Sequence, residues 1–232
     1  DSFLEVFCGE GMLTAVIMEI GLVAGEGIDS RWTSYGRVWD LRDPKARLCV
    51  AWLVAYGLRP LALHAGTPCT DHSQAGQHVM RPGTEEMASL VKDMLLHQEK
   101  QGYLASHEQP DGSLLYSREV WEQGFGPADD PWKPWKYYRT DGCQLGVVTP
   151  DRDAPGQPHR KTQKWMANFD LGPFVLRCQA TPALIPASHE HQQIRGSRPR
   201  SDGRWVPLAK ESGAYVAPQV ASNRRVAAAS IC

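Results

Sequence analysis

Residues 3–11 of this 232-residue chain read FLEVFCGEG, an apolar run followed at once by two closely spaced glycines. The run predicts a buried strand, and Cys8 to Gly11 predict a tight turn. Residues 12–20 then place apolar side chains on one helical face and end at Gly21, which predicts a helix. A strand, a glycine turn and a helix in this order open a β-α-β unit, so this stretch decides the fold.

The same alternation continues to residue 110. We expect a strand at 22–28, a helix at 46–56, a strand at 58–65, a helix at 85–101 and a strand at 103–107. Strands that alternate with helices predict an α/β fold with a doubly wound, mostly parallel sheet. Residues 1–110 are therefore expected to form a Rossmann-like core, a fold whose ligand sites lie at the carboxyl ends of the strands.

The rest of the chain has a different composition. Residues 111–160 are rich in Pro, Gly and Trp and predict a small irregular insertion. Residues 161–232 are expected to return to the core with a strand near 162–169, a basic loop at 190–210 and a C-terminal helix at 220–231. Residues 1–157 hold 14 Lys and Arg against 22 Asp and Glu, whereas 158–232 hold 11 against 4. The basic third fits either a polyanionic partner or a solvated surface.

Composition narrows the class of protein. With 42% hydrophobic residues the chain can bury a full core. No apolar run reaches the roughly 18 residues of a membrane-spanning helix, and no basic-then-apolar leader opens the chain. Six scattered cysteines favour reduced thiols. We expect an intracellular protein, nuclear or cytoplasmic, with no membrane partner, although a removed targeting segment stays open.

Acidic residues follow the predicted strands at positions that suit a nucleoside. Asp29 comes 20 residues after Gly9, where a carboxylate can accept both hydroxyls of a ribose, and Glu26 is a rival for that role. Asp40 follows the next element and is placed to accept from an adenine amino group. The turn at Phe7, Gly9 and Gly11 suits S-adenosylmethionine, which has no pyrophosphate to bind, better than it suits a dinucleotide.

A thiol and a carboxylate follow two later strands. Pro68 stiffens the exit from the strand that ends near residue 65 and holds Cys69 at the carboxyl edge of the sheet, where ligands bind. Most cysteines in apolar surroundings are inert, but Thr70 to Ser73 are polar and favour exposure. Glu108 follows the next strand in the same way, so it is expected beside Cys69 if those strands are neighbours.

These residues, in this order, resemble the cytosine-5 DNA methyltransferase family. Residues 3–11 look like its cofactor loop, Ile28–Asp29 like its ribose acid, Asp40–Leu41 like its adenine acid, and GTPCTDHS at 66–73 like its Pro-Cys loop. Glu108-Gln109-Pro110 stands where the family has Glu-Asn-Val or Glu-Asn-Pro. The resemblance covers residues 3–110. Beyond them the chain is more similar to divergent methylase-like domains found in mobile elements of algae and protists.

The resemblance implies a methyl transfer from S-adenosylmethionine to carbon 5 of a cytosine in DNA. Cys69 would add to carbon 6 and Glu108 would act at ring nitrogen 3, on a base flipped out of the duplex. The cofactor would lie against the loop residues and acids that match the family: Phe7, Gly9, Gly11, Asp29, Asp40 and Pro68.

The chain also departs from the family. The Gln-x-Arg-x-Arg motif is missing in that form, and residues 157–161 occupy a comparable place, which makes Arg160 the catalytic candidate there. Gln109 replaces the usual Asn, and the recognition region is reduced to parts of 111–160 and 178–210. Two alternatives therefore stay open: an inactive methylase-like module that binds nucleic acid, and a cytosine-5 methyltransferase acting on RNA.

Two further groups of residues have alternative readings. Cys143, Cys178, His189 and His191 would suit a zinc site, but their spacing is irregular, so we expect no metal. Several arginines with a neighbouring Trp suit a phosphate backbone, or else a flexible basic loop: Arg195, Arg198, Arg200, Arg204 and Trp205.

Overall fold

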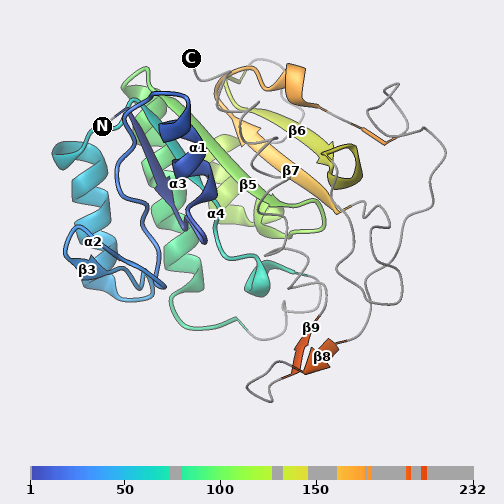
Figure 1. Ribbon diagram of the computed structural model, residues 1–232, viewed down its shortest axis with the longest axis horizontal. Coiled ribbons are helices and arrows are strands. Elements are labelled where there is room, and N and C mark those ends of the chain that lie inside the picture. The colour runs from blue at the N-terminus through green and yellow to red at the C-terminus, as the bar shows by residue number, and fades with distance from the viewer. Residues whose placement is uncertain are drawn as a thin grey trace.

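The computed structural model describes residues 2–73, 80–126, 133–145, 161–175, 177–178, 197–199 and 205–207. Its centre is a five-stranded sheet in the order β1 (Phe3–Val6), β4 (Ala62–Ala65), β5 (Leu104–Pro110), β7 (Thr162–Ala167) and β6 (Lys136–Asp141) (Figure 1). β1, β4 and β5 are parallel, and β7 is antiparallel to both of its neighbours. This confirms an α/β fold with a mostly parallel sheet, which is compatible with a Rossmann-like fold.

Helices cover both faces of the sheet because side chains along each strand alternate between the faces. On one face, Phe3 and Ala62 pack with α1 (Met12–Glu19). On the other, Leu4 and Leu63 pack with α2 (Pro44–Trp52), α3 (Thr84–Lys100) and α4 (Glu119–Phe125). In Figure 1, α1 lies in front of the strands and α3 and α4 lie behind them. The sheet is thus buried between two helical layers, and its carboxyl edge remains for the loops.

The strand expected at 22–28 is not continuous. Two isolated parallel bridges, Phe3 to Ala24 and Val6 to Ile28, hold this segment beside β1. Gly27 explains part of the interruption, because a Cβ there would lie 2.7 Å from the Sγ of Cys8. Glycine leaves room for that side chain but weakens a strand.

The expected helices and strands of the core differ from the structure mainly at their ends. Asp43 caps α2 by accepting from the Lys45 N–H at 3.0 Å, so α2 begins before residue 46, and it continues as a π-helical turn, Leu53–Gly57. β5 runs on to Pro110, which places Glu108 inside a strand. The remaining short elements are a hairpin, β2 (Thr33–Ser34) with β3 (Arg37–Val38), and 3-10 turns at Thr70–His72, Leu115–Ser117, Gly142–Leu145 and Gly172–Phe174.

The stretch expected to be irregular contributes to the core. Residues 111–160 contain α4 and also β6, which joins the sheet through β7. Trp121 and Trp135 are buried in the main hydrophobic cluster. Of the expected basic loop, the structure describes the backbone of β8 (Ser197–Pro199) and β9 (Trp205–Pro207), an antiparallel pair. The helix expected at 220–231 lies outside the described residues.

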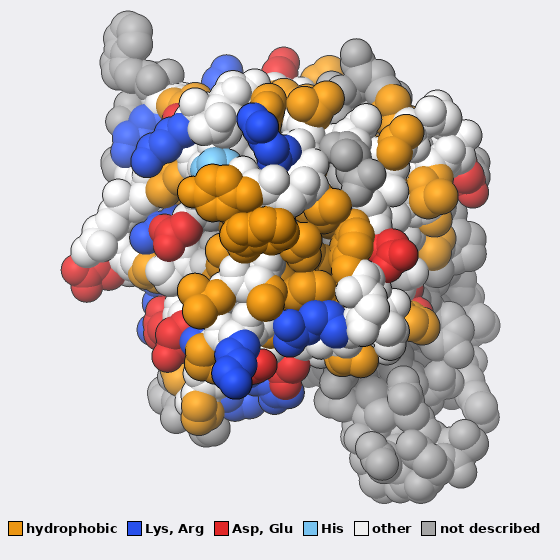
Figure 2. Space-filling view, turned by 90° about the vertical axis from the view of Figure 1, so that its left-hand side faces the viewer, with side chains coloured by type: hydrophobic (Ala, Val, Ile, Leu, Met, Phe, Trp, Pro, Cys, Tyr) orange, Lys and Arg blue, Asp and Glu red, His pale blue; other side chains and the backbone are white. Residues whose placement is uncertain are grey.

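The outer face of α2 is apolar. Leu48, Trp52 and Tyr56 recur at every fourth residue and are 73%, 58% and 73% exposed. Figure 2 shows hydrophobic side chains gathered on this side of the molecule. Leu48 is a shared wall of two shallow grooves, one toward α3 and one toward the β2–β3 hairpin.

Among the described helices, none combines the length and apolar character needed to cross a membrane.

Candidate active site

The glycine loop between β1 and α1 has an unusual backbone. Phe7, Gly9 and Gly11 have φ angles of 59°, 57° and 65°, in the left-handed region. Glycine adopts this region freely, but a bulky residue such as Phe7 does so only against strain. The N–H groups of Phe7 and Cys8 both donate to the Ile28 carbonyl, at 2.7 and 3.3 Å, and hold the turn. Strain held in this way is typical of a functional loop.

Glu5 ties the loop to the helix that follows it. Its side chain is buried, and its Oε2 accepts from both the N–H of Thr14 (2.9 Å) and the Thr14 hydroxyl (2.7 Å). Gly11, the N-cap residue of α1, has no side chain to cap the helix, so this carboxylate from β1 takes that role. The positive end of α1 is therefore already partnered by an anion of the protein itself.

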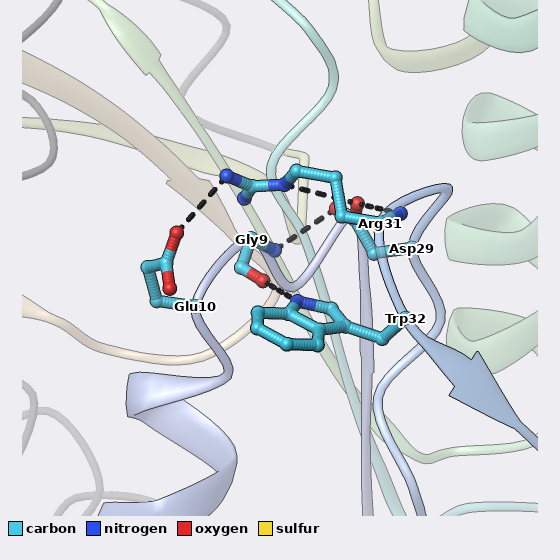
Figure 3. Close-up of polar contacts among 5 residues, drawn as sticks. All are labelled: Gly9, Glu10, Asp29, Arg31 and Trp32. Atoms are coloured by element: carbon cyan, nitrogen blue, oxygen red, sulfur yellow. Dashed lines mark hydrogen bonds and ion pairs between the residues drawn. The ribbon is translucent and has the colours of Figure 1, made fainter. Parts of the chain in front are cut away.

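Asp29 lies directly against the glycine loop. Its Oδ2 accepts from the Gly9 N–H at 3.0 Å, and its Oδ1 accepts from the N–H and Nε of Arg31 at 3.0 and 3.4 Å (Figure 3). Gly9 and Asp29, which are 20 residues apart in the sequence, are thus in direct contact. Three of the roughly four lone-pair positions of this carboxylate are taken by protein donors.

Arg31 and Trp32 complete this cluster, and sequence analysis had passed over both. The Nη1 of Arg31 pairs with Glu10 at 3.0 Å, and the indole N–H of Trp32 donates to the Gly9 carbonyl. Figure 3 shows the guanidinium extended between Asp29 and Glu10. A Cβ at Gly9 would lie 2.9 Å from this guanidinium. The available signal was the position of Arg31 two residues after an Asp, a spacing that favours an Asx turn.

The other two candidate acids have different surroundings. Asp40 binds Arg42 through both oxygens, at 2.9 and 2.7 Å, and this hydrogen bonding lowers the pKa of Asp40. Glu26, the rival of Asp29, accepts from the Tyr35 N–H at 2.6 Å. Of the two rivals, Asp29 is the one that contacts Gly9.

The loop that carries Cys69 is anchored by β5. Thr67 is buried, its hydroxyl lies 2.9 Å from Nε2 of His107, and its carbonyl accepts from the side-chain amide of Gln109. The side-chain oxygen Oε1 of Gln109 in turn accepts from the Ser113 hydroxyl at 2.9 Å. Pro68 is exposed, and Cys69 follows it half-buried. These bonds fix the backbone immediately before the thiol.

His107 extends this network into the core. It is fully buried, and its Nδ1 lies 2.9 Å from the Tyr116 hydroxyl. Burial holds the pKa of His107 well below its ordinary value and raises the pKa of Tyr116 well above it. A neutral imidazole donates through one nitrogen and accepts through the other, so both hydroxyls can be satisfied. The anchor is therefore uncharged at neutral pH.

Glu108, the Cys69 loop and the glycine loop meet at Gly66. The register of β4 and β5 pairs Ala65 with His107, which brings Gly66 beside Glu108. A Cβ built on Gly66 would lie 4.0 Å from Oε2 of Glu108 and 3.8 Å from the carbonyl oxygen of Phe7. The structure thus brings the candidate cofactor loop and the candidate carboxylate to one point on the carboxyl edge of the sheet.

Two charges of opposite sign act on the Cys69 thiol. Burial raises the pKa of Cys69, the Glu108 carboxylate raises it further, and Lys161 lowers it. Lys161 immediately precedes β7 and has a φ of 20°. The backbone N–H of Asp111 donates to the Thr162 carbonyl at 3.0 Å and holds this end of β7 beside the end of β5. Lys161 is thus the described cation that acts on Cys69, whereas the sequence pattern favours its neighbour Arg160. Arg160 lies outside the described residues.

The residues after Cys69 are also held in place. Asp71 is buried and binds Arg81 Nε at 2.8 and 2.9 Å and the Thr84 hydroxyl at 2.5 Å. His72 is fully buried, and within the described part of the chain neither ring nitrogen has a hydrogen-bond partner. Other candidates lie outside the described residues or have only their backbone described: His189, His191, Arg195, Arg198, Arg200, Arg204 and Trp205.

No model of a known protein family matches the chain, and no curated protein matches its sequence.

Proposed function

We propose that this protein is an S-adenosylmethionine-dependent methyltransferase that modifies carbon 5 of cytosine in DNA. One observation carries the proposal: the glycine loop, the loop presenting Cys69 and the carboxylate of Glu108 converge at Gly66. A reaction between a bound cofactor and a base requires these three parts on one edge of the sheet. A DNA substrate places the protein inside the cell, in the nucleus or the cytoplasm.

The charges around Cys69 support its role as nucleophile toward carbon 6. At rest, burial and the negative charge of Glu108 keep the thiol protonated. The Cys69 proton passes to Glu108, which shares it with ring nitrogen 3, so the negative charge of Glu108 is lost as the thiolate forms. Lys161 favours the thiolate throughout. The sulfur then adds to carbon 6, and carbon 5 gains electron density and takes the methyl group from the cofactor's sulfonium. A solvent water removes the carbon 5 proton, and the electrons of that C–H bond restore the 5,6 double bond as Cys69 leaves as a thiolate.

The cofactor half of the site fits S-adenosylmethionine, which supplies a methyl group on a positively charged sulfur. Glu5 already partners the N-terminus of α1, so a phosphate group would meet a carboxylate at the place where dinucleotides are usually held. A ligand with a nucleoside and no phosphate meets no such repulsion. Asp29 keeps a lone pair for a ribose hydroxyl, and a second hydroxyl would take the place of Arg31 Nε.

The proposal that the substrate is a polynucleotide rests on the distribution of charge along the chain. The last 75 residues carry the excess of Lys and Arg, and a flipped base needs a cationic surface to hold the flanking phosphates. The basic loop at 190–210 is the proposed contact with the backbone, and Arg160 keeps its proposed catalytic role at the flipped base.

A second candidate function is an inactive methylase-like module that binds nucleic acid. The observation that favours it is the cluster in Figure 3, where Asp29 is occupied by Gly9 and Arg31 without any ligand. In such a module the cofactor pocket would be closed by its own side chains.

A trapping experiment distinguishes the two candidate functions. The protein is incubated with labelled S-adenosylmethionine and with DNA or RNA oligonucleotides that contain 5-fluorocytosine, whose fluorine cannot leave as a proton does. A methyltransferase gives a denaturation-resistant adduct, and the nucleic acid that gives it identifies the substrate. The adduct must disappear in Cys69→Ser and persist in Cys49→Ser, a half-buried cysteine on α2. No adduct on either substrate would rule out the enzyme and leave the binding module.

A further inference from the structure

Helix α2 presents apolar side chains to solvent where a surface helix ordinarily presents polar ones. Residues 48–58 read LCVAWLVAYGL and contain no charged side chain. Val54 packs in the core, whereas Leu48, Trp52 and Tyr56 are each more than half exposed. A helix that is apolar on all sides is ordinarily buried on all sides, and exposed apolar patches mark contact surfaces. We therefore expect another surface to cover this face.

The two borders of this apolar face carry opposite charges. On the side of α3, the groove beside Leu48 is lined by Glu86 and Asp93. On the side of the β2–β3 hairpin, the groove is lined by Arg37, whose guanidinium lies 4.7 Å from the centre of the Trp39 ring. An apolar stripe between an acidic and a basic border is complementary to a second copy of itself.

The other charges near the face leave these borders in place. Arg47 also lines the groove toward α3, but its Nη1 donates to two backbone carbonyl groups of the preceding loop, at 3.1 and 2.8 Å. Lys45 lies in the first turn of α2, before the apolar stripe begins. Asp93 pairs with Lys92 at 3.2 Å, and an exposed pair of this kind is weak enough for Asp93 to take a second cation.

The fold places the two borders at similar levels along α2. Both α2 and α3 link segments that run parallel in the sheet, so the two helices run in the same direction. They begin side by side, since a Cβ at Gly83 would lie 3.2 Å from the Cα of Arg42. Equal rise along both helices then brings Asp93 level with the middle of the apolar stripe. Arg37 is held nearby, because its Nη1 donates to the Sγ of Cys49 at 3.6 Å.

We propose that this protein forms a two-fold symmetric dimer through the outer face of α2. A two-fold axis that lies in the interface parallel to α2 places Trp52 against the partner's Trp52 and Arg37 against the partner's Asp93. An axis perpendicular to α2 would place each border against a border of like charge. The net charge of −1 lets two copies approach, whereas the acidic border opposes binding to an anionic membrane. The proposal does not depend on the proposed function.

The first test is the mass of the full chain in solution. Sedimentation equilibrium between about 1 and about 100 μM is expected to show a change from one chain of 25.8 kDa to twice that mass. Trp52→Lys should keep the mass of one chain, because two ammonium groups would meet at the axis. Met18→Lys is the matched control on α1, at a residue 60% exposed against 58% for Trp52, and should dimerise. A monomeric wild type, or dimerisation of Trp52→Lys, overturns the proposal.

An exchange of charges tests the direction of the axis. Arg37→Glu and Asp93→Arg each place like charges across one border, so each should raise the dissociation constant of the dimer about tenfold. Both substitutions in one chain make the borders opposite again and should restore the wild-type constant. Glu119→Arg, at an exposed position on α4, should leave it unchanged. A further loss in the double variant overturns this arrangement.

Cross-linking covers the case in which Trp52→Lys does not fold. With the axis parallel to α2, Tyr56 faces the partner's Tyr56 and Leu48 faces the partner's Leu48. Tyr56→Cys and Leu48→Cys should therefore each form a disulfide-linked dimer on mild oxidation, and Met18→Cys should not. Linking only when Leu48→Cys is mixed with Tyr56→Cys would show antiparallel helices and overturn the proposed axis. Equal linking in Met18→Cys would indicate random collision and overturn the interface.

Discussion

The two halves of the candidate active site are built differently. The cofactor half, residues 5–11 and 29–32, is a set of opposite charges and backbone groups already paired at about 3 Å. The thiol half, residues 66–69, 107–109 and 161, holds a neutral thiol between a carboxylate and an ammonium group that act on it in opposite directions. The first half is suited to fixed geometry, and the second to a change of charge during a reaction.

The largest effect is expected where the thiol half is anchored to β5. Gln109→Leu removes the donor to the Thr67 carbonyl and the acceptor for Ser113, both in the buried network. Unsatisfied buried groups of this kind cost about 2 kcal/mol, so the free energy of unfolding in urea should fall by about that amount, and the Cys69 adduct should be lost. Gln123→Leu, at an exposed position on α4, should change stability by less than about 0.5 kcal/mol. Equal losses in the two variants would mean that the Gln109 network does not anchor the loop.

A smaller effect is expected in the cofactor half. If Asp29 holds the ribose as proposed, Asp29→Ala should weaken binding of S-adenosylmethionine about tenfold in calorimetric titration, because the proposed hydrogen bonds to the ribose are lost. Arg31→Met should have the opposite sign and tighten binding a few-fold, since it removes the Nε donor from Oδ1 of Asp29 and leaves only the backbone donor there. Glu26→Ala is the matched control and should leave binding unchanged. Weaker binding in Arg31→Met would show that Arg31 holds the ligand rather than competing with it.

The smallest effect is a pair of opposed pH shifts. The negative charge of Glu108 raises the pKa of Cys69, so Glu108→Gln should move the rise of its alkylation rate by iodoacetamide to lower pH. The positive charge of Lys161 lowers the pKa, so Lys161→Met should move the same rise to higher pH, and Lys161→Arg should restore it. Rates at Cys69 are read by peptide mass spectrometry. Shifts in the same direction would point to altered burial instead of charge.

The sequence was enough to predict which candidate residues lie close together where those residues are near the ends of neighbouring strands. Gly9 and Asp29 both come after the carboxyl ends of adjacent parallel strand segments. Cys69 follows β4, and Glu108 lies in the last part of the neighbouring parallel strand β5, so the order along the chain was enough to predict that each pair lies at one edge. Whether each performs its predicted role is a separate matter for the experiments above. Helix α3 was also predictable, because its apolar residues repeat at helical spacing over a long stretch.

Other features depend on contacts between distant parts of the chain. β6 and α4 lie in a region whose Pro and Gly content suggested an insertion, and only pairing with β7 shows that β6 belongs to the sheet. Lys161 acts on Cys69 because β7 runs antiparallel to β5, and local periodicity does not encode that direction. Cys178 likewise reaches the end of β6 through a contact between distant residues, because its N–H donates to Oδ2 of Asp141 at 2.9 Å.

The carboxylate of Glu5 has a consequence for the entropy of binding. Its burial is stabilised by the two donors of Thr14, so docking of β1 against the first turn of α1 favours burial of this carboxylate during folding. The intervening residues 7–11 are then fixed at both ends. A ligand arriving at this loop finds its backbone already ordered, and the conformational entropy lost in ordering it belongs to folding and does not weaken the complex.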